Sequence, residues 1–184
     1  MLAAAAELFY ENGYAATSTA DIANRMGIQR GSVYYYFETK EGLLLELIED
    51  VYRHALASLA KVQATELDPV GKLQALIVNH VLAFTSALIP GAIVLNESRS
   101  LSTENRERLR GDAEAYEAGI EALIAEGQTA GLIRADLDPR LAAMAILGAV
   151  NWVHRWYRPS DPFTPDEIGR QFAEVLLGGL NDHR

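Results

Sequence analysis

A run of polar and aromatic side chains near residue 30 has the strongest potential for binding chemistry in this sequence. Lys40 follows a segment that reads Gln29-Arg30-Gly31-Ser32-Val33-Tyr34-Tyr35-Tyr36-Phe37. Successive positions of a helix lie ~100° apart, so three consecutive Tyr cannot all face one core and some phenols must point outward. Exposed Tyr and Ser beside Arg and Lys form a composition suited to gripping phosphates. Alternatively, the three Tyr bind nothing and form a Tyr-rich edge of the core.

Two short helices must position this run. Ser18 followed by Asp21 is the pattern of a capping box, and it predicts a helix over Thr19–Met26. Gly27 ends that helix, and a second one follows over about Arg30–Phe37. Two short helices joined by a tight Gly turn are typical of the helix-turn-helix, whose second helix enters the major groove of DNA. A helical hairpin of an ordinary bundle shows the same spacing, which leaves that alternative open.

The whole chain reads as helical, because apolar residues recur at three- and four-residue spacings and no strand-length alternation occurs. We therefore expect an all-α protein with a helix-turn-helix domain over 1–45 and a second domain over 46–184. The turn should enclose a small core of Ile22, Met26, Ile28 and Val33, with Ala23 where the two helices approach. Further helices are expected near 1–12, 40–64, 69–88, 102–130, 138–156 and 165–181, with Pro90-Gly91 as a break. The helix over 138–156 is apolar nearly all round, which predicts burial on several sides, in part by a second subunit.

Composition excludes several classes of function. The 184 residues include no Cys, which rules out disulfides, thiolate metal sites and thiol nucleophiles. No run approaches the ~20 apolar residues that span a bilayer, so we expect a cytoplasmic protein. The sequence has no Gly-rich phosphate loop, no His-Glu-x-x-His and no nucleophile elbow, so we expect no enzymatic activity and no cofactor. No metal site is predicted by the spacing of His54, His80, His154 and His183.

The overall charge argues against an unspecific polyanion partner. The formal net charge is −9, and residues 1–50 hold only Arg25, Arg30 and Lys40 against eight acidic residues. Nonspecific DNA binding depends on Lys and Arg side chains that neutralise phosphates. Arg30 and Lys40 both belong to the run near residue 30, so the surface there is less acidic than the total implies.

The first 50 residues carry an ordered set of short motifs. They are Leu8-Phe9, Gly13-Tyr14, Ala16-Thr17-Ser18, Ile22-Ala23, Gly27-Ile28, Gly31-Ser32-Val33-Tyr34-Tyr35-Tyr36-Phe37 and Lys40-Glu41-Gly42-Leu43. Together they resemble the N-terminal domain of tetracycline-repressor-type (TetR family) transcriptional regulators. The resemblance implies an all-α homodimer whose paired recognition helices bind a palindromic operator, with a ligand-binding and dimerisation domain behind them. It implies a repressor that a small molecule releases from DNA.

The resemblance also implies roles for individual residues. Its pattern assigns base-edge contacts to Arg30, Gly31 and Ser32. It assigns phosphate contacts to Thr19, Tyr34, Tyr35, Tyr36 and Lys40, with Val33 and Phe37 in the core. Physically, Arg30 can donate two parallel hydrogen bonds to guanine, and Lys40 lies near a helix N-terminus that attracts phosphate. Gln29 can read adenine or simply cap the helix.

One departure from the family pattern concerns charge. Family members usually carry a basic arm before the first helix, whereas the first helix here begins at Met1-Leu2. With few cations near an operator, we expect weak and salt-sensitive DNA binding. The alternative function is a ligand-binding helical dimer with weak or lost DNA binding, which sequesters a molecule or serves as a scaffold.

A second resemblance rests on the C-terminal part of the chain. Its residues are Asn151-Trp152-Val153-His154-Arg155-Trp156-Tyr157-Arg158-Pro159, Thr164-Pro165-Asp166-Glu167-Ile168 and Phe172. They look like the branch that regulates fatty-acid and steroid breakdown, whose effectors are often acyl-CoA thioesters. Trp152 and Trp156 lie four apart on one helix face and Arg155 adds a cation, which suits an acyl chain with a phosphorylated head. Alternatively, both Trp pack in a dimer interface, and Arg155 and Arg158 pair with Asp161, Asp166 or Glu167.

A set of eight residues is the candidate effector site. They are His80, Phe84, Arg99, Tyr116, Asn151, Trp152, Arg155 and Trp156. His80 lies on an apolar stripe, and the simpler interpretation is a buried structural His. The simpler interpretation of Arg99 is a residue of a solvated loop. We expect dimerisation through helices 138–157 and 165–181. A ligand among the helices that begin near 40, 69 and 102 would change the separation of the recognition helices, provided that it binds the two states with different affinity.

Overall fold

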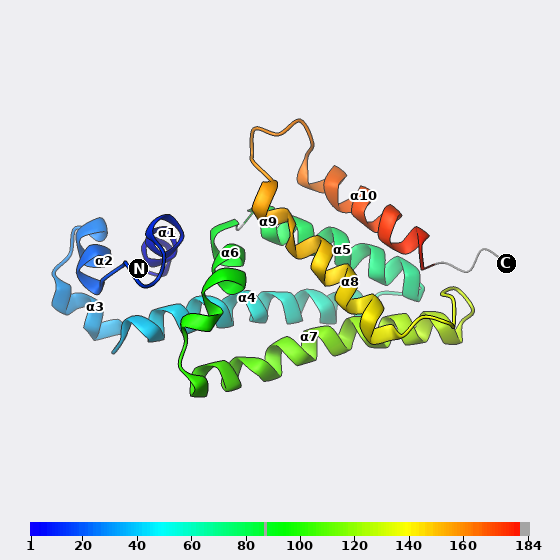
Figure 1. Ribbon diagram of the computed structural model, residues 1–184, viewed down its shortest axis with the longest axis horizontal. Helices are drawn as coiled ribbons and strands as arrows, with labels where there is room; N and C mark the ends of the chain where they lie inside the picture. The colour runs from blue at the N-terminus through cyan, green and yellow to red at the C-terminus, as the bar shows by residue number, and fades with distance from the viewer. Residues whose placement is uncertain (87, 181–184) are drawn as a thin grey trace. The chain divides into compact units, whose positions relative to one another are not determined.

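Every regular element that the structure describes is a helix (Figure 1). The computed structural model describes residues 1–86 and 88–180, without the side chains of Arg30 and Leu88. The all-α expectation is confirmed. The elements are α1 (Leu2–Asn12), α2 (Thr19–Met26), α3 (Arg30–Tyr36), α4 (Lys40–Gln63), α5 (Pro69–Ser86), α6 (Leu88–Glu97), η1 (Ser98–Ser100), α7 (Thr103–Thr129), α8 (Pro139–Asn151), α9 (Val153–Trp156) and α10 (Pro165–Gly178).

The helices form two compact units. Of the described residues, 1–53 and 88–111 make up the first unit, and 54–86 and 112–180 make up the second. Both α4 and α7 contribute residues to each unit. The division expected at residue 45 falls inside α4, and it does not anticipate that residues 88–111 return to the first unit.

The core of the first unit joins α1, α2, α3 and the start of α4 to residues from α6 and α7. Phe9, Ile22, Val33, Leu43 and Ile48 are fully buried in it. Burial of such side chains stabilises the unit by about 1.5–3 kcal/mol each relative to exposure. The returning segment completes the core with Ile93, Val94, Leu101 and Leu109. The helix-turn-helix therefore depends on side chains from residues 88–111 for its packing.

Two expected helix boundaries are wrong. The break was expected at Pro90-Gly91, but α6 includes both residues. Pro90 lies in the first turn of α6, where a missing backbone N–H costs no helical hydrogen bond. The expected continuous helix over 138–156 is divided at Trp152, which lies between α8 and α9. The limits of the other expected helices lie within three residues of those observed.

The second unit is organised around α5. Helices α8, α9 and α10 all pack on α5. Asp138 caps the start of α8, and the Thr164–Glu167 capping box begins α10. Gly169 of α10 lies tightly against α5, because a Cβ at this position would lie 3.0 Å from the Cα of Val78. Similarly, a Cβ at Gly119 of α7 would lie 2.3 Å from Leu59 Cδ2. Glycine thus sets the spacing of helices in this unit.

Candidate DNA interface and effector pocket

The turn between α2 and α3 has the geometry that its sequence predicts. Ser18 Oγ accepts the Asp21 N–H at 3.2 Å, while Asp21 Oδ2 accepts the Ser18 backbone N–H at 2.8 Å. Hydrogen bonds from the Ser18 hydroxyl and backbone N–H lower the pKa of Asp21. Gly27 ends α2 with φ of 66°, a left-handed conformation that favours glycine. The expected small core is confirmed: Ile22, Ala23 and Val33 are buried, and Met26 and Ile28 are partly buried against them.

The outer face of α3 carries phenols and small polar groups. Tyr34, Tyr35 and Tyr36 are 43%, 83% and 68% exposed, which confirms that phenols of this run point outward. The Tyr34 hydroxyl lies 3.0 Å from the hydroxyl of buried Thr19, and the Tyr35 and Tyr36 rings meet edge to face at 5.0 Å. Gln29, Gly31 and Ser32 are also exposed, and a Cβ at Gly31 would meet open space. Arg30 begins α3, but its side chain lies outside what the structure describes.

Lys40 holds the loop between α1 and α2 against the start of α4. Its Nζ donates to the carbonyls of Tyr14 at 2.9 Å and Thr17 at 2.8 Å, and lies 4.1 Å from the centroid of the Tyr14 ring. We call this arrangement the Lys40 clamp. The Thr17 hydroxyl is buried beneath it and donates to the carbonyls of Leu8 and Gly13. Sequence reasoning missed the clamp, because loop carbonyls leave no signal in the sequence.

The remaining cation of the first 50 residues is bound to carboxylates. Arg25 on α2 contacts Glu7 at 3.1 Å and Glu11 at 2.7 Å, both on α1. A third carboxylate, that of Glu41, accepts hydrogen bonds from the Ser102 backbone N–H at 2.7 Å and from Asn105 Nδ2 at 2.6 Å. These bonds lower the pKa of Glu41. Glu7 and Glu11 thus share the positive charge of Arg25, whereas Glu41 keeps its negative charge.

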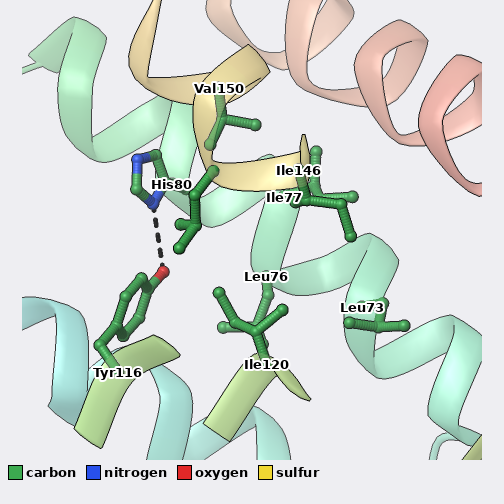
Figure 2. Close-up of a pocket in the computed structure, with 9 residues that line it drawn as sticks. Leu73, Leu76, Ile77, His80, Tyr116, Ile120, Ile146 and Val150 are labelled. Carbon is green, nitrogen blue, oxygen red and sulfur yellow. Dashed lines mark hydrogen bonds between the residues drawn. The ribbon is translucent and has the colours of Figure 1, made fainter. Parts of the chain in front are cut away.

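An apolar cavity lies among three helices of the second unit (Figure 2). Its volume is about 10 Å³, room for no more than a single water molecule. Sequence reasoning treated the aliphatic lining only as core, because a stripe at helical spacing does not distinguish a solid core from a cavity wall. The lining residues are Leu73, Leu76, Ile77 and His80 of α5, Tyr116 and Ile120 of α7, and Ile146, Leu147 and Val150 of α8.

One end of this cavity is polar. His80 Nδ1 lies 3.1 Å from the Tyr116 hydroxyl, and His80 Nε2 lies 2.9 Å from Asn151 Oδ1. The His80 ring stacks on Phe84 with centroids 4.6 Å apart. Burial lowers the pKa of His80 to about 4 and raises the pKa of Tyr116 to about 12, so both are neutral near pH 7. The structure brings four candidates together: His80, Phe84, Tyr116 and Asn151.

The other four candidates neither line this cavity nor belong to the group around His80. Trp152 is 61% exposed, with the Arg155 guanidinium 5.8 Å from its ring centroid. Trp156 is 37% exposed and its ring lies 6.4 Å from that of Phe172. Arg99 is exposed on η1 in the first unit. Of the alternative partners proposed for Arg155 and Arg158, Asp166 pairs with Arg170 at 2.8 Å, and Asp161 accepts the Arg158 backbone N–H at 2.8 Å.

The geometry defines a class of protein. A capped helix, a glycine turn and a second helix with an exposed polar face make up a helix-turn-helix DNA-binding unit.

Among the described residues, no group of three or more His, Asp or Glu is arranged to hold a metal ion. No single helix in the described part of the chain is long and apolar enough to cross a membrane, although the bent pair Pro69–Ser86 and Ile89–Ser100 reaches that length and composition together.

Comparison with known proteins identifies the family. Residues 1–47 match the family described as "Bacterial regulatory proteins, tetR family", and residues 66–180 match "Tetracyclin repressor-like, C-terminal domain". The chain is 32% identical to the HTH-type transcriptional repressor KstR2 of Rhodococcus jostii (strain RHA1), over 98% of this chain and 89% of that protein. The chain therefore belongs to the TetR family of transcriptional regulators. The KstR2 proteins of Rhodococcus jostii and Mycobacterium tuberculosis, which are similar to this chain, are transcriptional repressors rather than enzymes.

Two solved structures of relatives are similar over nearly the whole chain. One is the ketosteroid transcriptional regulator KstR2 of Mycobacterium tuberculosis, with a TM-score of 0.92 and 28% identity over 99% of this chain and 93% of that one. The other is AibR in complex with isovaleryl coenzyme A and operator DNA, with a TM-score of 0.85 and 27% identity over 98% of this chain and 95% of that one. The resemblance read from the residues is thereby confirmed.

Proposed function

We propose that this protein is a ligand-responsive transcriptional repressor, which binds a palindromic operator as a homodimer and is released by a hydrophobic small molecule of the acyl-CoA class. The observation that carries the proposal is the exposed phenol and hydroxyl face of α3, held on a buried helix-turn-helix core. AibR, which has the same fold, was crystallised with operator DNA and an acyl-CoA together. A relative with 32% identity is a repressor.

The proposed DNA contacts divide into base and phosphate contacts. Exposed Gln29, Gly31 and Ser32, with Arg30 beside them, are suited to base edges. The exposed phenols of α3 and the Thr19–Tyr34 hydroxyl pair are suited to phosphates. Lys40 has a third ammonium donor beyond the two that its clamp uses, and that donor is the one proposed to reach a phosphate. The phosphate set is Thr19, Tyr34, Tyr35, Tyr36 and Lys40.

The proposed dimer uses the apolar surface of α8 to α10. Leu141 and Met144 on α8 are 65% and 55% exposed, and Val175 on α10 is 75% exposed. Exposed apolar side chains gathered on neighbouring helices support contact with a second copy. In the dimer, the two recognition helices would lie about 34–36 Å apart, one turn of DNA.

The proposed effector site combines the apolar cavity with the α9 surface. His80 and Tyr116 line the polar end of the cavity, where an apolar chain would enter, and Phe84 and Asn151 contact His80 there. Trp152, Arg155 and Trp156 supply an aromatic and cationic surface suited to a phosphorylated head. The remaining candidate, Arg99, belongs to the first unit and is not assigned to this surface. Release from DNA requires that the effector bind the two conformations with different affinity.

Gel-shift titration against DNA upstream of the gene, repeated over a salt series, tests the proposal. We expect sequence preference at low salt, and we expect Arg30→Ala to relax that preference by about 1–3 kcal/mol at one base pair. Thioesters should displace the protein from DNA, whereas free CoA should not. Absence of any sequence preference would overturn the repressor function and favour the alternative of a ligand-binding dimer that does not act on DNA.

A further inference from the structure

The polar end of the cavity is a continuous chain of neutral hydrogen bonds across three helices. Tyr116 of α7, His80 of α5 and Asn151 of α8 follow one another at 3.1 Å and 2.9 Å. Figure 2 shows the His80 ring and the Tyr116 hydroxyl facing each other, with the aliphatic wall beside them. Of the described residues that line the cavity, only His80 and Tyr116 have polar side chains, and Asn151 is hydrogen-bonded to His80. Recognition of any polar atom of a ligand in this cavity therefore falls to this chain.

The chain has a defined direction. Asn151 Oδ1 is an acceptor, so His80 Nε2 must carry the proton that it receives. A neutral imidazole then has an unprotonated Nδ1, which accepts from the Tyr116 hydroxyl. The stack on Phe84, with planes only 10° apart, holds the His80 ring in this orientation. Between Tyr116 and His80 there is thus one donor facing one acceptor.

A hydroxyl oxygen inserted between these two groups can satisfy both, whereas a carbonyl oxygen can satisfy only Tyr116. A ligand hydroxyl accepts from Tyr116 and donates to His80 Nδ1, and a ligand carbonyl accepts from Tyr116. A carboxylate finds no Lys or Arg among the described lining residues and would be buried against aliphatic side chains, which is costly for a charge. The cavity of about 10 Å³ must also widen to admit a ligand, and insertion at the Tyr116–His80 bond separates the two helices that this bond joins.

We infer that Tyr116, His80 and Asn151 select the uncharged oxygen, hydroxyl or carbonyl, of an otherwise apolar ligand, and that they exclude carboxylates. This inference rests on the proposed function only in taking the cavity as the effector site. The charged part of a ligand such as a thioester would then lie outside the cavity, and its uncharged oxygen would lie at the chain.

Calorimetric titration of the full chain at pH 7 with 1-octanol, 2-octanone and octanoate tests the inference, because these probes share one apolar body. We expect saturable binding of the alcohol and the ketone, with octanoate at least about tenfold weaker. In Tyr116→Phe, the affinity for the alcohol should fall about tenfold and its preference over octanoate should be lost. The matched control Ile146→Val trims the apolar wall and should keep the preference.

The results distinguish the site from the proposed function. Octanoate that binds the wild-type chain as tightly as octanol, or octanol binding that does not saturate, would overturn the inference whether or not Tyr116→Phe folds. If the chain prefers octanol over octanoate but binds no operator in gel shifts, the proposed site is upheld and the repressor function is overturned. Operator binding without the selectivity would uphold the repressor and overturn this role of the chain.

Discussion

The Lys40 clamp of the first unit and the His80 chain of the second unit both join separate segments, but by different chemistry. Lys40 is a cation that donates to two backbone carbonyls of one loop. His80 is neutral and is bound only by side chains, those of Tyr116 and Asn151. A ligand can displace a side-chain partner while the backbone stays in place. A loop carbonyl, in contrast, can be displaced only if the loop itself moves. The contrast separates a fixed support from an exchangeable contact.

The energies of the two arrangements point the same way. A hydrogen bond that involves a charged group contributes about 1.5–3 kcal/mol, and a neutral one contributes about 0.5–1.5 kcal/mol. The clamp should therefore open less often than the neutral chain, which should exchange one partner at modest cost. The helix-turn-helix needs a constant shape to read DNA, and an effector pocket needs bonds that a ligand can take over.

Removal of the clamp should have the largest effect. We expect Lys40→Ala to lower the free energy of unfolding by about 3 kcal/mol, since two charge-assisted bonds are lost, and to weaken binding to all DNA sequences alike. Urea denaturation at fixed protein concentration measures the first effect. Lys61→Ala, an exposed position on the same helix, is the control.

The salt dependence of DNA binding by Lys40→Ala sharpens the comparison. If Lys40 also contacts a phosphate, the slope of log affinity against log salt should fall by about one. An unchanged slope with reduced stability would assign Lys40 to the clamp alone. An unchanged stability would contradict the distinction between fixed and exchangeable contacts.

The pH dependence of stability tests the neutral state of His80. Burial lowers its pKa from the ordinary 6.5 to about 4, so between these values the unfolded chain binds a proton that the folded chain does not. The free energy of unfolding should therefore fall, by up to about 3 kcal/mol, as the pH is lowered from about 6.5 to about 4. Denaturation midpoints measured across this range should show the fall. The same slope in His80→Gln would mean that His80 does not cause it.

A smaller effect is expected where α10 crosses α5. Ala at position 169 would place its Cβ 3.0 Å from Val78 Cα, and backbone cannot rotate away as a side chain can. We expect Gly169→Ala to destabilise the protein by about 1–2 kcal/mol in thermal unfolding. Gly111→Ala, where a Cβ would meet nothing within 4 Å, should stabilise it by about 0.5–1 kcal/mol. Equal effects of the two substitutions would contradict close packing at Gly169.

Local signals explain what the sequence predicted well. The limits of α2 follow from the Ser18–Asp21 capping box and from Gly27, all within a few residues of the helix. The exposed phenols follow from helix periodicity alone. The limits of α6 were missed because the effect of Pro90 depends on its position in the helix. Proline disrupts a helix interior but is tolerated in the first turn, and the sequence does not show in advance where the helix begins.

Features that depend on distant segments were not predicted. The cavity requires α5, α7 and α8 to meet, and the aliphatic residues that line it have the same spacing as a solid core. His80, Tyr116 and Asn151 were each selected singly as candidates, but their hydrogen bonds join positions 36 and 71 residues apart. The return of residues 88–111 to the first unit likewise depends on a core that only the folded chain assembles.

The hydroxyl pair of Thr19 and Tyr34 has a consequence for the entropy of operator binding. With its oxygen 3.0 Å from the Thr19 oxygen, Tyr34 already has its ring restrained in the free protein. A side chain that is ordered before its partner arrives loses less rotational freedom on association than one that must be ordered by it. In the proposed complex, Tyr34 would therefore act as a preorganised anchor against which the more exposed phenols of α3 align.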